Sequence, residues 1–117
     1  ENTRLELRSP DPTANPYLAF AACLAAGLEG MEKRLELPPC VDENVSAWTE
    51  EKRRNLEIER LPRNLCDAVN ALEADPFLLE VIGRETARQY IDSKRKEWSS
   101  YPSQVTQWEI REYLNRY

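Results

Sequence analysis

The stretch from Asn15 to Leu35 limits most strongly what this 117-residue chain can fold into. Asn followed by Pro16 is a usual helix start, because the Asn side chain caps free N–H groups and proline suits the first turn. Large apolar side chains follow helical spacing along one side of this predicted helix. The opposite side of its first half is apolar too, because it holds Leu18, Cys23 and several alanines. Such a helix is normally buried on every face in a larger protein, so we expect packing partners outside this sequence. The large residues at helical spacing are Tyr17, Phe20, Leu24, Leu28, Met31 and Leu35.

The residues before this helix show a different periodicity. Thr3 to Leu7 alternate polar and apolar side chains, which predicts one β-strand. A single strand is unstable, and no later segment has a clear strand pattern, so its pairing partners must also lie elsewhere. Ser9 to Pro12 contains two prolines and predicts the turn that ends the strand.

The rest of the chain predicts loops and helices. Leu37 to Val45 is expected to be a loop, and Ser46 to Pro62 an exposed, charged segment with one helical turn from Thr49. After Pro62 we predict a helix ending before Asp75, a short helix from Phe77 to Ile82 stopped by Gly83, and a longer helix through Ala87 and Trp98. Thr106 and Glu109 form a capping-box pattern that begins a terminal helix with Ile110, Tyr113, Leu114 and Tyr117 on one side. The predicted fold class is mainly α, with about five helices preceded by one orphan β-strand.

Composition excludes several classes of function. The chain has no histidine, which excludes a His-dependent triad and a His metal cage. None of its 3 glycines has the spacing of a phosphate-binding loop. The net charge of −5 is mixed along the chain, so we expect no nucleic-acid partner. The longest uncharged run, between Asp11 and Glu29, is shorter than the ~20 apolar residues of a membrane span, so we expect no membrane partner.

Two further features concern the origin of the chain. Its three cysteines, Cys23, Cys40 and Cys66, are widely spaced and odd in number, which indicates reduced thiols and a cytoplasmic protein. The only methionine is Met31, so we expect a chain that opens at Glu1 to be a piece of a longer protein.

The group with most chemical promise is Arg4-x-Glu6-x-Arg8. Side chains two residues apart on a strand point the same way, about 7 Å apart, so the carboxylate would lie between two guanidinium groups. A hard divalent cation prefers carboxylate oxygen, and phosphate or carboxylate substrates prefer Arg. This group therefore suits an ATP-and-metal site. The alternative is a row of exposed ion pairs on the wet face of a sheet.

The remaining charged and aromatic groups are given structural interpretations. Two basic runs, residues 52–54 and 94–96, are interpreted as solvated helix charges balanced by nearby acidic residues. The three tryptophans are interpreted as packing anchors, with Trp98 and Trp108 as a possible interface. Ser46 has no neighbours that mark it as a phosphate acceptor.

The segment from Arg4 to Tyr17, R-L-E-L-R-S-P-D-P-T-A-N-P-Y, resembles R-[IV]-E-x-R-x-x-D-P-x-x-N-P-Y of bacterial type I glutamine synthetase. The likeness continues through Leu24–Gly30, Asp42–Asn44 and Gln104–Glu109, and so covers essentially the whole chain. It implies a C-terminal fragment of the family's α+β catalytic domain, residues 1–117. Within it, residues 1–12 would be the last active-site strand and turn, and residues 13–117 a helical region.

The resemblance also implies an activity and roles for single residues. Enzymes of this family are ligases that transfer the γ-phosphoryl group of ATP to L-glutamate and let ammonia displace it. By position, Glu6 would bind Mg²⁺ or Mn²⁺, Arg8 would bind glutamate, and Arg4 would lie beside the ATP phosphates; no catalytic residue is assigned. Ser46 stands where many relatives have a tyrosine that some lineages adenylylate.

The resemblance implies partners as well. The remainder of the subunit and neighbouring subunits of a homo-oligomer, a dodecamer in this family, would complete each site, so the fragment alone is expected to be inactive. The alternative is a non-catalytic helical module for protein interaction, derived from a protein of this kind.

Overall fold

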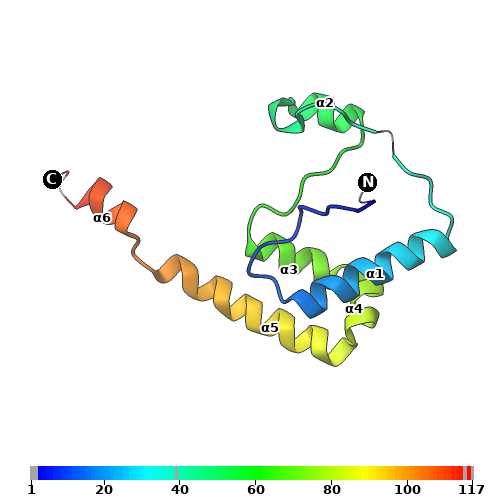
Figure 1. Ribbon diagram of the computed structural model, residues 1–117. Helices are drawn as coiled ribbons and strands as arrows, with labels where there is room; N and C mark the ends of the chain where they lie inside the picture. Colours follow the sequence, from blue (N-terminus) through cyan, green and yellow to red (C-terminus); the bar gives the residue numbers. More distant parts are fainter. Residues whose placement is uncertain (1–2, 39, 115, 117) are drawn as a thin grey trace. The chain divides into compact units, whose positions relative to one another are not determined.

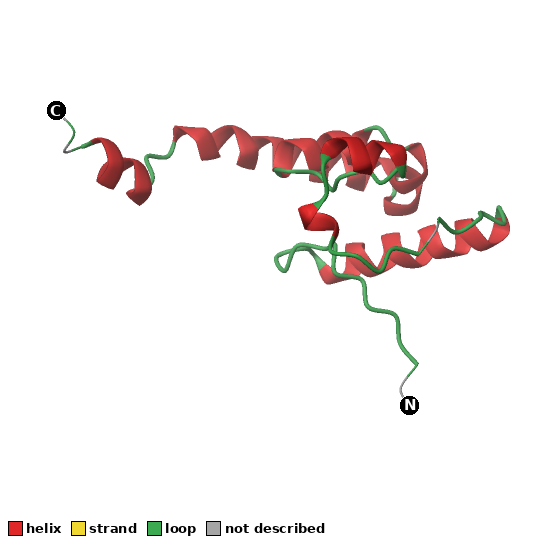
Figure 2. Cartoon of the chain, turned by 90° about the horizontal axis from the view of Figure 1, so that it is seen from above, coloured by secondary structure: helices red, strands yellow, loops and turns green. Residues whose placement is uncertain are grey.

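The computed structural model describes residues 3–38, 40–114 and 116, and it divides into two compact units, Glu1–Leu61 and Pro62–Tyr117. In the described residues all regular structure is helical, with six α-helices and two short 3₁₀ helices (Figure 1). Figure 2 shows these helices in red, joined by loops. The mainly α prediction is therefore confirmed.

The strand predicted for Thr3 to Leu7 is not formed. Residues 3–9 carry no regular secondary structure. A strand exists only as part of a hydrogen-bonded ladder, and the described part of the chain contains no second strand with which this segment could pair.

Helix α1, Pro16–Glu32, begins as the sequence predicts and ends three residues before the predicted Leu35. The Asn15 side chain accepts hydrogen bonds from the N–H groups of Tyr17 and Leu18 at 3.0 and 3.2 Å. At the other end Arg34 adopts a φ of 50° and turns the chain away from the helix axis. Because no residue of α1 is buried, its apolar positions are available for packing: the large ones named above are 48–83% exposed within the helix.

The charged segment that follows holds more structure than one helical turn. It contains the 3₁₀ helix η1, Val45–Ala47, and helix α2, Glu50–Asn55, whose first turn is capped by the Thr49 side chain. Most of the segment is exposed as predicted, but Trp48, Lys52 and Ile58 are half-buried. Arg53, predicted to be a solvated charge, is only 8% exposed. Its guanidinium donates to the Val45 carbonyl and so ties α2 to η1.

The second unit contains a small core made by three helices, α3 (Leu65–Glu73), α4 (Pro76–Ile82) and α5 (Arg84–Ser100). These helices pack against one another, and the buried apolar side chains of the unit come from α3 and α5: Val69, Ala87 and Ile91. Asp75 caps α4, and Gly83, at a φ of 87°, ends it and opens α5. A side chain would be strained at this φ, which explains why glycine separates the two helices.

The chain continues into η2, Tyr101–Ser103, and α6, Gln107–Tyr113. The capping box predicted for Thr106 and Glu109 is confirmed. Among the described residues, α6 packs against no other helix, and its Trp108 lies edge-on to Tyr113. The predicted member of its apolar side at position 117 lies outside the described residues. No helix in the described part of the chain has both the length and the apolar character to cross a bilayer.

Candidate functional site

The structure brings the three predicted site residues together. Arg4 Nε donates to Glu6 Oε1 at 2.7 Å, and Arg8 Nη2 donates to Glu6 Oε2 at 2.9 Å. Each carboxylate oxygen thus receives one guanidinium N–H. The segment therefore places the three side chains on one side of the chain without a strand ladder.

These charges are accessible to solvent. The Glu6 side chain is 44% exposed and that of Arg8 is 87% exposed. Hydrogen bonds from Arg8, and then from Arg4, hold the pKa of Glu6 below its ordinary value, so the carboxylate is ionised at neutral pH. Exposed ion pairs contribute little to stability, so this cluster is better suited to binding than to holding the fold together.

The donor set matches two kinds of ligand. An ionised carboxylate is a ligand for a hard divalent cation, and guanidinium groups bind carboxylates and phosphates through parallel N–H groups. Glu6 offers only one of the several oxygen ligands such a cation needs. No group of three or more potential metal ligands is found among the described residues.

A tight turn connects this cluster to α1. The Asp11 carboxylate accepts from the Thr13 N–H at 2.7 Å and from the Thr13 hydroxyl at 2.5 Å. Ala14 N–H donates to the Asp11 carbonyl at 3.0 Å, directly before the Asn15 cap. The direction in which the chain leaves Arg8 is therefore held by local hydrogen bonds.

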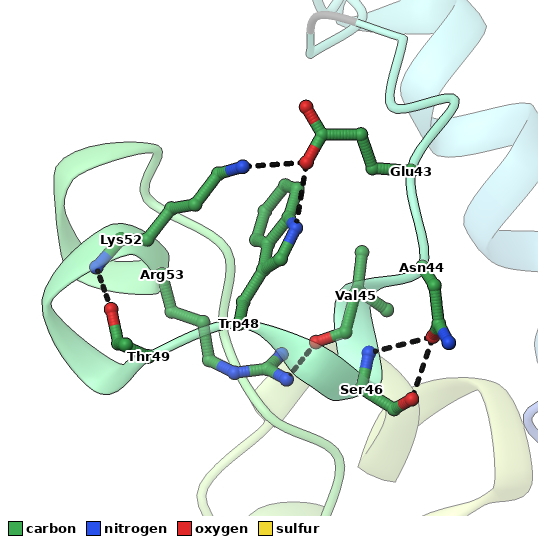
Figure 3. A network of polar contacts seen from close by, with 8 residues as sticks. All are labelled: Glu43, Asn44, Val45, Ser46, Trp48, Thr49, Lys52 and Arg53. Carbon is green, nitrogen blue, oxygen red and sulfur yellow. Dashed lines mark hydrogen bonds and ion pairs between the residues drawn. The ribbon is translucent and has the colours of Figure 1, made fainter.

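A second polar network lies around Trp48 and was not predicted (Figure 3). Glu43 accepts from the Trp48 indole N–H at 2.9 Å and from Lys52 Nζ at 2.5 Å. The Lys52 ammonium also lies over the Trp48 ring, 4.3 Å from its centroid. The one signal in the sequence that connects two of these residues is the four-residue spacing of Trp48 and Lys52. Nearby, the Ser46 hydroxyl donates to the Asn44 side-chain oxygen at 2.6 Å.

In the other basic run, Lys94 pairs with the nearby Glu97 at 2.7 Å, as predicted. Arg95 pairs instead with the distant Glu73 of α3, which the sequence did not predict. Cys23 and Cys40 are exposed, free thiols, and Cys66 is a half-buried one. None of these groups joins the Arg4–Glu6–Arg8 cluster by a hydrogen bond or an ion pair.

The chain matches known proteins over almost its whole length. A family described as glutamine synthetase, catalytic domain, matches residues 1–113. The glutamine synthetase of Methanocaldococcus jannaschii is 45% identical over 96% of this chain, and that of Thermotoga maritima is 44% identical over 96%. These alignments cover 25% and 26% of the relatives, so the chain spans about a quarter of the length of the curated relatives it matches.

Two solved structures share the fold of this chain. One described as apo GmaS without ligand aligns with a TM-score of 0.73 and 44% identity, covering 93% of this chain and 25% of that one. A GmaS/ADP complex aligns with a TM-score of 0.76 and 44% identity, covering 93% and 24%. Because the family model matches residues 1–113 and relatives named glutamine synthetase are 44–45% identical over 96% of this chain, the chain belongs to the glutamine synthetase catalytic-domain family.

Proposed function

We propose that these 117 residues are the C-terminal part of a glutamine synthetase subunit. Its full-length form would join ammonia to L-glutamate at the expense of ATP. The observation that carries the proposal is the Arg4–Glu6–Arg8 cluster, in which one ionised carboxylate is held between two guanidinium groups at 2.7 and 2.9 Å. This cluster lies within a chain that matches the family over residues 1–113.

The proposed roles follow from the chemistry of each side chain. Glu6 is one oxygen ligand of Mg²⁺ or Mn²⁺, and its lowered pKa favours this role because the carboxylate carries no proton that a cation would have to displace. Arg8 is the most exposed of the three side chains and binds the glutamate substrate. Arg4 lies beside the ATP phosphates. When bound, the cation would neutralise charge on the phosphoryl group that is transferred.

The site is completed by groups outside this chain. Positioning of ATP and of divalent cations needs several ligands, and the cluster supplies one carboxylate. The remainder of the subunit, and neighbouring subunits of a dodecamer in the cytoplasm, would supply the others. In that setting residues 1–12 form the last active-site strand and turn of an α+β domain, and residues 13–117 its helical region. The 117-residue chain alone is therefore expected to be inactive.

A second candidate function is a non-catalytic helical module for protein interaction. The exposed apolar positions of α1 favour it, because such positions could pack against a different protein. The two candidates differ in what Glu6 and Arg8 do. Only the catalytic proposal requires them for turnover.

The test is steady-state kinetics on the full-length protein, with metal and glutamate titrated separately. Glu6→Ala should abolish turnover, and Glu6→Asp should retain a little, because a shorter carboxylate still offers oxygen at an imperfect distance. Arg8→Lys should chiefly raise the KM for glutamate, because an ammonium keeps the charge but loses the planar fork. Glu36→Gln, a charge change at an exposed residue outside the cluster, is the control and should leave both constants unchanged. Near-normal kcat and KM for both Glu6→Ala and Arg8→Lys would refute the assignment.

A further inference from the structure

The turn that precedes α1, residues 9–15, is restricted in two ways. Pro10 and Pro12 fix their own φ angles, and each disfavours a helical conformation at the residue before it. Asp11 adds hydrogen bonds, because one oxygen of its carboxylate accepts both from the N–H and from the hydroxyl of Thr13, at 2.7 and 2.5 Å. The path of the chain into α1 is therefore narrowly defined.

The hydrogen bonds of this turn are local. The Thr13 donors lie two residues after Asp11, and the Ala14 N–H that donates to the Asp11 carbonyl lies three residues after it. The Asn15 side chain caps α1 through N–H groups two and three residues ahead. These bonds need no residue outside 11–18, so the same turn can form in a full-length subunit.

Arg8, directly before the turn, has few other contacts that fix its position. Its side chain is 87% exposed, and its one ion pair among the described residues is with Glu6 at 2.9 Å. Residues 3–9 carry no regular secondary structure. Within this chain, the direction of the Arg8 guanidinium thus depends on the backbone, and the turn is the side that leads to a helix.

We propose that Asp11 is a positioning residue for the glutamate substrate and acts through Arg8, an inference that rests on the proposed role of Arg8. Asp11 accepts the two Thr13 donors and so keeps the chain on the path that presents the guanidinium to the substrate. A bidentate contact requires two N–H groups to face one carboxylate, so affinity falls when the guanidinium is spread over several directions. Loss of the turn should therefore weaken the binding of glutamate and leave that of ATP.

The first test is steady-state kinetics on the full-length protein, with glutamate and ATP titrated separately. Asp11→Ala should raise the KM for glutamate by about three- to tenfold and leave kcat and the KM for ATP within about twofold. Asp11→Asn keeps an acceptor oxygen for Thr13 and should restore the KM for glutamate to within about twofold of the original value. Asp92→Ala, which removes an exposed carboxylate of α5, is the control and should change none of the three constants.

Two results of these kinetics would overturn the proposal. Equal effects of Asp11→Asn and Asp11→Ala would mean that the charge of Asp11, and not the turn, is what glutamate binding needs. A lower kcat with an unchanged KM for glutamate would mean that Asp11 only stabilises the fold, because fewer folded molecules give that result.

A double-variant cycle separates this inference from the proposed function. Arg8→Lys alone should raise the KM for glutamate, and Asp11→Ala should add less than about twofold in the Arg8→Lys protein, because its effect passes through the guanidinium. An undiminished effect of Asp11→Ala in that protein would show that Asp11 acts independently of Arg8, and the inference would then be wrong. An unchanged KM in Arg8→Lys alone would refute the role of Arg8 itself, and with it the inference.

Discussion

Two residues other than glycine adopt the left-handed conformation in the described part of the chain, and each follows the end of a helix. Arg34 has a φ of 50° after α1, and Glu57 has a φ of 54° after α2. At both ends two backbone hydrogen bonds close the turn; after α2 these run from Glu57 to Arg54 at 3.1 Å and from Ile58 to Arg53 at 3.0 Å. This is the Schellman arrangement, in which glycine is the usual residue because it has no Cβ to be strained.

Glu57→Gly should therefore strengthen the end of α2. Removal of the Cβ relieves about 1–2 kcal/mol of left-handed strain. Glycine also gives the unfolded chain more conformational freedom, which offsets part of this gain, so the net stabilisation is about 0.5–1 kcal/mol. That corresponds to about two- to fivefold slower hydrogen exchange at the Ile58 amide. Glu59→Gly is the control, because Glu59 is not at a positive φ and should lose protection instead. Faster exchange in Glu57→Gly would contradict this explanation.

Glu6 makes a second prediction at the scale of one residue. The pKa of Glu6 is lower in the folded chain than its ordinary value of 4.5. The stabilisation from its ion pairs is therefore fully present above pH 4.5 and is lost as the pH falls through the lowered pKa. Carbon-13 NMR titration of the Glu6 carboxyl should give a pKa below 4.5 that rises in Arg8→Gln and rises less in Arg4→Gln. Arg34→Gln should not move it. A titration insensitive to both neighbours would show that the pairs do not form in solution.

The helices differ in what holds them. α3, α4 and α5 pack together, so a shared core stabilises these helices in addition to their capping residues. α6 packs on no other helix among the described residues, so its stability rests on its own hydrogen bonds and its cap. Short isolated helices are marginal in water, so α6 should be sensitive to loss of its cap.

Thr106→Ala should largely unfold α6. The Thr106 hydroxyl accepts from the Glu109 N–H at 3.2 Å, and Glu109 accepts in return from the Thr106 N–H at 2.7 Å. Loss of a capping side chain costs about 0.5–2 kcal/mol, which is comparable to the whole stability of so short a helix. Alpha-carbon chemical shifts of residues 107–113 should move toward random-coil values. Thr106→Ser, which keeps the capping oxygen, should preserve them.

At the scale of the whole molecule the main feature is how little is buried. Only Val69, Ala87 and Ile91 form buried apolar core among the described residues, whereas the large apolar side chains of α1 remain exposed. Each Å² of apolar surface left in water costs about 25 cal/mol. An isolated chain of this kind should therefore cover α1 by association.

The 117-residue chain should self-associate through α1 and bind a hydrophobic dye. Leu24→Gln should weaken both effects. Leu61→Gln is the matched control, since Leu61 is as exposed as Leu24 but lies outside α1, and it should change neither effect. Sedimentation equilibrium with dye fluorescence measures both properties. A compact monomer that binds no dye would mean that α1 does not need the neighbours we infer for it.

The amino-acid sequence was enough to predict the features that depend on residues within about four positions of one another. The Asn15 cap, the capping box of α6 and the Arg4–Glu6–Arg8 cluster are of this kind, because their partners are neighbours along the chain. The cluster also formed without the predicted strand, since side chains two residues apart can meet in any extended segment.

The tertiary structure alone decided what depends on more distant partners. The Thr3 to Leu7 pattern predicted a strand, but a strand needs a second one, which the described part of the chain does not supply. Arg53 is buried because it reaches back eight residues to Val45, and Lys52 reaches back nine residues to Glu43. Local charge patterns could not predict either contact, because both depend on how the loop before α2 folds back over that helix.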